Sequence, residues 1–132
     1  MAEAGGALIL IVEDNDENLK LARDVLQWSG YRTVEATTGE AAVARASEHL
    51  PDLILMDIQL PGGLDGIAAF QRIRRDGATA HIPVVAFTAS VMTSDRERFT
   101  AAGFDGFMAK PINVREFPDQ VRAFCERGRA AR

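Results

Sequence analysis

The run Leu53-Ile-Leu-Met56 is apolar, has the length of a strand, ends in the carboxylate of Asp57 and is followed by Pro61. A continuous apolar run bounded by a turn signal is typical of a strand buried on both faces, as in the parallel sheets of α/β proteins. Because an unpaired buried charge is costly, Asp57 needs water, a cation or a positively charged partner. The run therefore indicates a covered parallel sheet with a carboxylate at one edge.

Apolar runs of strand length alternate with segments whose apolar residues recur at helical spacing. Repeated five times, this alternation predicts an α/β protein whose parallel sheet is covered by helices on both faces. The expected strands are 7–12, 31–36, 52–57, 82–87 and 104–109, and the helices that follow them are expected to begin near Asn15, Thr37, Asp65, Ser94 and Asn113.

Capping residues mark where these helices start, because their side chains accept a bond from a free backbone N–H group. Pro118 lies just past the first turn of the last helix and has no N–H to donate. That helix is therefore expected to begin late or to bend. The expected caps are Asn15 or Asp14, Thr37 paired with Glu40, Asp65, and Ser94 paired with Glu97.

The 132 residues fit one domain at 7–127, with a flexible tail at 1–6 and a basic tail at 128–132. A net charge of −4 argues against nucleic acid as a direct partner. Cys125 is the only cysteine, which predicts no internal disulfide and a reducing, cytoplasmic setting. No apolar run has the length of a membrane span, and the first residues do not resemble a signal peptide.

Polar groups stand at the carboxyl ends of four expected strands, where ligands of open α/β sheets collect. Glu13, Asp14 and Asp57 would raise one another's pKa, and a hard cation such as Mg²⁺, or Mn²⁺ in its place, would relieve their repulsion. Lys110 adds positive charge and Thr88 a hydroxyl donor. Each residue taken alone fits an ordinary cap or loop, but together they favour a carboxylate that attacks phosphorus.

Four motifs carry a family resemblance: Ile9–Asn15, Pro51–Pro61, Pro83–Ala89 and Lys110-Pro111. In order and spacing they resemble the receiver domains of two-component response regulators, and their residues are most similar to those of the DivK-type single-domain regulators. The resemblance covers about residues 7–127. It implies a flavodoxin-like, doubly wound (βα)5 fold with five parallel strands in the order 2-1-3-4-5. It also implies a cis Lys110-Pro111 bond. The loop at 61–66 is one residue longer than the usual loop of the family.

The resemblance implies a phosphoacceptor and a metal site. Asp57 would take the phosphoryl group, and Asp14 and Asp57 would bind Mg²⁺ directly. Glu13 would bind the ion through water, and the backbone carbonyl of Gln59 would complete the site.

The resemblance also implies residues that read the phosphate. Thr88 and Lys110 would hold the phosphoryl oxygens, and Phe107 would turn inward as Thr88 moves. Gln59 and Ser90 occupy positions that tune the rate of dephosphorylation.

The function implied is a phosphorylation-dependent switch that takes phosphate from a histidine kinase or a His phosphotransfer protein. It would phosphorylate and dephosphorylate only itself, so it is not expected to be an enzyme with a separate substrate. Its output would be a downstream protein bound at the last helix–strand–helix surface, with the chain a monomer or a phosphorylation-promoted dimer and no membrane contact.

Three alternatives remain. The chain could be a receiver cut from a larger DNA-binding regulator or hybrid kinase. An aspartyl-phosphate phosphohydrolase of the haloacid dehalogenase type needs a second acid two residues after the nucleophile, where this chain has Gln59. A flavodoxin-like FMN binder needs a neutral phosphate loop, and the acids of Glu13–Asp16 would repel phosphate.

Overall fold

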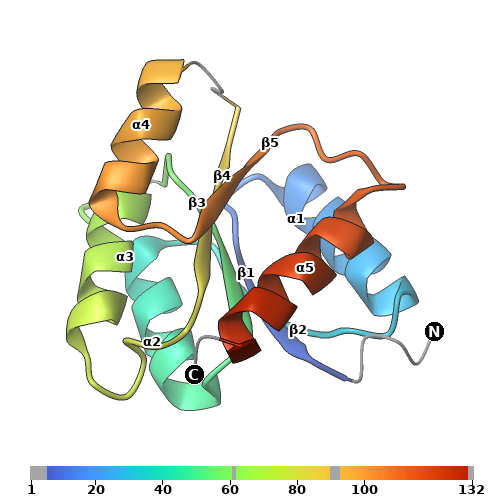
Figure 1. Ribbon diagram of the computed structural model, residues 1–132, viewed down its shortest axis with the longest axis horizontal. Coiled ribbons are helices and arrows are strands. Elements are labelled where there is room, and N and C mark those ends of the chain that lie inside the picture. The colour runs from blue at the N-terminus through green and yellow to red at the C-terminus, as the bar shows by residue number, and fades with distance from the viewer. Residues whose placement is uncertain (1–5, 61, 90–92, 131–132) are drawn as a thin grey trace.

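The computed structural model describes residues 6–60, 62–89 and 93–130, in which strands and helices alternate regularly (Figure 1). This alternation confirms the predicted α/β class. The strands are β1 (Leu8–Val12), β2 (Arg32–Ala36), β3 (Leu53–Asp57), β4 (Val84–Thr88) and β5 (Gly106–Ala109). The helices are α1 (Asp16–Trp28), α2 (Gly39–His49), α3 (Gly66–Arg75), α4 (Thr93–Ala102) and α5 (Phe117–Ala130).

All neighbouring strands pair in parallel, in the order β2-β1-β3-β4-β5. The predicted strand order is thus confirmed, and the polar β2 lies at an edge as expected. In the register, Asp57 stands beside Phe87 and Thr88 beside Ala109. The carboxyl ends of the strands therefore share one edge of the sheet.

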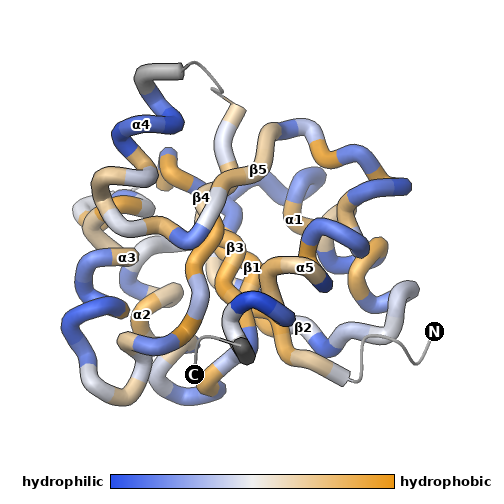
Figure 2. Tube along the Cα trace, viewed as in Figure 1, coloured by the Kyte–Doolittle hydropathy of each residue, from blue (hydrophilic) through white to orange (hydrophobic). Residues whose placement is uncertain are grey.

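Two helical layers cover the sheet, and each closes its own apolar cluster (Figures 1 and 2). Side chains of successive strand residues point to opposite faces. Residues such as Leu10, Ile54 and Ala86 pack under α2, α3 and α4, whereas Ile9, Leu55 and Phe87 pack under α1 and α5. The central strands β3 and β4 are buried along their whole length, as their continuous apolar runs predict.

Helix starts agree with the capping predictions at Asn15 and Asp65. The Asn15 side chain accepts from the Asn18 N–H at 2.9 Å, and that of Asp65 accepts from the Ala68 N–H at the same distance. The prediction for Thr37 is wrong by one residue, because Thr38 caps α2 and accepts from the Ala41 N–H at 3.1 Å. Both threonines can cap, and the backbone path selects the second.

Two further boundary predictions are corrected. Helix α4 already includes Thr93, so Ser94 lies inside the helix and is not its cap. Helix α5 continues to Ala130, so residues 128–130 of the predicted basic tail are helical. The strand predictions at 82 and 104 also begin two residues early, because Ile82 still donates to Thr79 in a turn.

Pro118 has the effect expected of it. Helix α5 begins only at Phe117, which places Pro118 in the first turn, where its missing N–H is tolerated. The Asn113 side chain instead accepts from the N–H groups of Arg115 and Glu116 in a preceding turn. In the part of the chain that the structure describes, no helix has both the length and the apolar character needed to cross a membrane.

Candidate functional site

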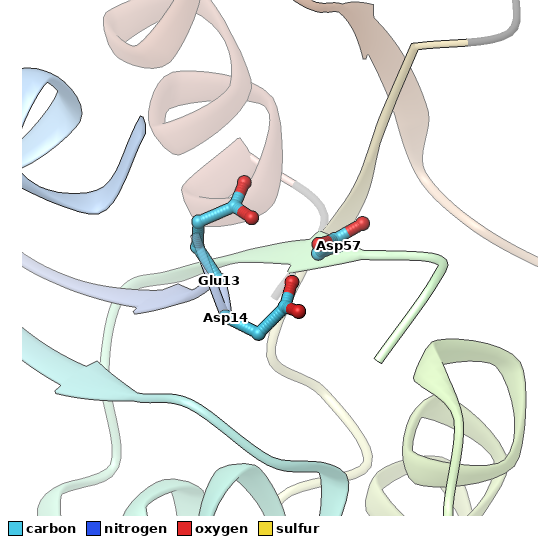
Figure 3. A group of neighbouring side chains, drawn as sticks. All are labelled: Glu13, Asp14 and Asp57. Atoms are coloured by element: carbon cyan, nitrogen blue, oxygen red, sulfur yellow. The ribbon is translucent and has the colours of Figure 1, made fainter. Parts of the chain in front are cut away.

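Three acidic side chains meet at the carboxyl edge of the sheet. Glu13 and Asp14 follow β1, and Asp57 is the last residue of β3. One carboxylate oxygen from each lies within 4.8 Å of the others, and Figure 3 shows the three groups gathered between these strand ends. The expectation that separate strands bring these acids together is confirmed.

The acids differ in exposure. Glu13 is 1% exposed and Asp57 4% exposed, whereas Asp14 is open to solvent. Backbone groups fix the buried pair: the Gln59 N–H donates to Asp57 Oδ1 at 3.0 Å, and the Asn15 N–H donates to Glu13 Oε2 at 3.2 Å. The cluster is therefore rigid on its inner side and accessible at Asp14.

Lys110 joins the cluster from the end of β5. Its Nζ lies 2.6 Å from Glu13 Oε1 and 3.2 Å from Asp57 Oδ2. Both contacts are ion pairs, so the Lys110 ammonium group bridges the two buried acids. The Lys110 N–H donates to the Thr88 carbonyl at 2.8 Å, and the Lys110-Pro111 bond is cis, as predicted.

The single positive charge of Lys110 does not neutralise the two buried acids, Glu13 and Asp57. Burial is the main cause that raises the pKa of Asp57 from 3.8 to about 7, and the neighbouring Glu13 carboxyl group adds to the rise. Lys110 and the Gln59 N–H act in the opposite direction. Since three acids face a single ammonium group, their oxygens are suited to a hard divalent cation.

Three further predicted site residues lie in or close to β3, β4 and β5. Thr88 is buried at the end of β4. Phe107 of β5 packs against the apolar core under α3 and α4. The side chain of Gln59 is exposed. Ser90 lies outside the described residues. The roles given to these residues by resemblance stay predictions.

Gly66 is a positioning residue that the motifs did not single out. A Cβ atom at this position would collide with the backbone carbonyl of Asp57 and stand 2.8 Å from the Cα atom of Ile58. The Gly66 N–H donates to the Ile58 carbonyl at 3.2 Å. The first turn of α3 thus packs directly behind the acid. A glycine immediately after the Asp65 cap is the signal that could have indicated this contact.

Comparison with known proteins agrees with this geometry. The model of the response regulator receiver domain family matches residues 9–122. The chain belongs to this family. This receiver domain is 42% identical over 116 residues to the polar-differentiation response regulator DivK of Brucella anthropi, an alignment that covers 88% of this chain and 94% of the relative.

Solved structures extend the comparison. The receiver domain of the sensor histidine kinase PA1611 from Pseudomonas aeruginosa is 35% identical, has a TM-score of 0.83, and covers 92% of this chain and 98% of its own. That structure has a magnesium ion coordinated in its active-site cleft. A CheY-like receiver protein from Methanospirillum hungatei is 21% identical with a TM-score of 0.84, covering 96% and 98% of the two chains, and supports the fold alone.

Proposed function

We propose that this receiver domain is a phosphorylation-dependent switch in which Asp57 accepts a phosphoryl group from the phosphohistidine of a histidine kinase or a His phosphotransfer protein. The observation that carries the proposal is the buried Asp57 carboxylate, held beside two further acids and the Lys110 ammonium group at the carboxyl edge of the sheet. Membership of the family and the similarity to DivK support the same function.

The donor set fits Mg²⁺. The acids supply only oxygen ligands, which lie within 4.8 Å of one another, and Asp14 is open to water. Asp14, Asp57 and the Gln59 carbonyl would bind the ion, with Glu13 acting through water; Mn²⁺ would use the same oxygens. When bound, the ion supplies positive charge to the phosphoryl oxygens.

In the transfer step, an Asp57 carboxylate oxygen attacks phosphorus while the P–N bond to the donor histidine breaks. The electron pair of that bond stays on the imidazole nitrogen, which takes up a proton, and Asp57 becomes an acyl phosphate. The Lys110 ammonium group, 3.2 Å from Asp57 Oδ2, is placed to hold the charge of the arriving oxygens, and the Thr88 hydroxyl would donate to them. Hydrolysis of the acyl phosphate resets the switch, so no separate substrate is turned over.

Phosphate at Asp57 would shift an equilibrium between inactive and active states of the domain. Thr88 moves toward the phosphate in this proposal, and Phe107 turns inward behind it. The surface of α4, β5 and α5 then binds a downstream protein or a second copy of the chain.

Acetyl phosphate provides a direct test, because it donates a phosphoryl group without a kinase. Incubation with Mg²⁺ should add one phosphoryl group per chain in intact-mass spectra, and Asp57→Ala should abolish the addition. Asp65→Asn is the matched control, since asparagine caps a helix as well as aspartate does and should keep full labelling. Undiminished labelling of Asp57→Ala would refute the assignment.

A further inference from the structure

The ring of Phe107 lies under an arginine from the neighbouring helix. The guanidinium carbon of Arg96, on α4, is 5.0 Å from the centroid of the Phe107 ring on β5. This distance is within the range of an attractive cation–π contact. Arg96 is exposed and Phe107 is half-buried, so the arginine covers the ring from the solvent side.

The strand register places a small side chain beside the ring on the side of the phosphoacceptor edge. Phe107 pairs with Ala86, and Thr88 is the next residue of β4 whose side chain points to the same face. The β4 position level with the ring thus carries only a methyl group. A ring that tilts toward Thr88 meets no large side chain from that strand position.

Full burial of Phe107 would weaken its contact with Arg96. A ring moved deeper into the apolar cluster under α3 and α4 leaves an arginine that stands in solvent. Phenylalanine has no hydroxyl that needs a partner when buried, so apolar contact favours the inward position. The guanidinium contact favours the half-exposed one.

We infer that Arg96 is a positioning residue that holds Phe107 in its half-exposed position and so lowers the population of the phosphate-ready state. The inference rests on the proposed function, because it concerns the resting bias of that switch. Loss of the contact should shift the ratio of the two states about 2- to 5-fold, equivalent to about 0.5–1 kcal/mol.

The test compares Arg96→Ala with Arg98→Ala. Arg98 lies on the same helix, and its guanidinium carbon stands 5.3 Å from the centroid of the Phe99 ring, but Phe99 is 1% exposed and locked in the core. The apparent affinity for beryllofluoride with Mg²⁺, a phosphate mimic, should rise about 2- to 5-fold in Arg96→Ala, because the competent state is more populated. Arg98→Ala should bind like the wild type.

Removal of the ring gives a second control. In a Phe107→Leu background the effect of Arg96→Ala should vanish, because leucine offers no π face. NMR signals of the Phe107 ring should shift toward their beryllofluoride-bound values in unliganded Arg96→Ala. These two readouts distinguish loss of the Arg96–Phe107 contact from general destabilisation of helix α4.

The outcomes distinguish the two proposals. A wild-type chain that neither takes phosphate from acetyl phosphate nor binds beryllofluoride defeats the proposed function. A wild type that does both, with an Arg96→Ala variant of unchanged affinity and unchanged ring signals, overturns the role of Arg96 alone. An equal gain in Arg98→Ala, or a gain that persists without the ring, also overturns it.

Discussion

Asp57 is almost completely buried, and it lies beside another buried acid, Glu13. Its pKa is raised to about 7, first by burial and then by Glu13. In the unfolded chain the same group has its ordinary pKa of 3.8. The folded state therefore binds more protons than the unfolded state between these two values, and the charge on Asp57 costs stability as pH rises through this range.

Asp57→Asn should therefore stabilise the metal-free protein at neutral pH. The rise of the pKa from 3.8 to about 7 sets an upper limit of about 4 kcal/mol. We expect a gain in unfolding free energy on the order of 1–2 kcal/mol, because Lys110 loses one of its partners. The gain should be full above pH 7 and vanish below about pH 4. Urea denaturation at a series of pH values without divalent ions measures it, and a variant less stable than the wild type at pH 7.5 would contradict the raised pKa.

The site residues were predictable because the carboxyl ends of parallel strands share an edge. Glu13, Asp14, Asp57 and Lys110 needed only that rule and the positions of the strands. The distances from Lys110 to the two buried acids were not predictable. That Lys110 lies closer to Glu13 than to Asp57 depends on side-chain packing around the end of β5, which no local pattern encodes.

At the scale of elements, α3 is the helix that fixes the back of the site. Its cap at Asp65 was predicted from side-chain chemistry alone. The close approach of Gly66 to the Asp57 backbone was not, because it depends on how α3 packs on β3. Likewise Thr37 and Thr38 are chemically equivalent caps, and only the entry path of the chain distinguishes them.

Gly66→Ala should move α3 away from β3, because the added Cβ would meet backbone atoms that have little freedom to shift. We expect a loss of about 1–3 kcal/mol in unfolding free energy, the usual range for overpacking, together with slower phosphorylation by acetyl phosphate. Gly63→Ala is the matched control, since a Cβ there meets nothing within 4 Å. Denaturation midpoints and labelling rates that are equal in the two variants would show that the close approach is unimportant.

At the scale of the whole molecule, the alternation of strands and helices was sufficient to predict the α/β class. The strand order required the family resemblance, because periodicity alone does not say which strands are neighbours. The order matters for function: it places β1 beside β3 and β4 beside β5. The acids and Lys110 meet only in such an arrangement.

A chain of net charge −4 with three acids at one edge should be stabilised as a whole by Mg²⁺. An ion that binds only the folded state adds about 1.4 kcal/mol at ten times its dissociation constant, and for a domain of this size that corresponds to a rise of roughly 4–8 °C in Tm. Calorimetry with millimolar MgCl2, against NaCl of equal ionic strength, separates binding from screening. Asp14→Asn should reduce the rise and keep the fold, because Asp14 is exposed and outside the buried pair. Equal shifts in both salts would mean that the acids merely repel one another and hold no ion.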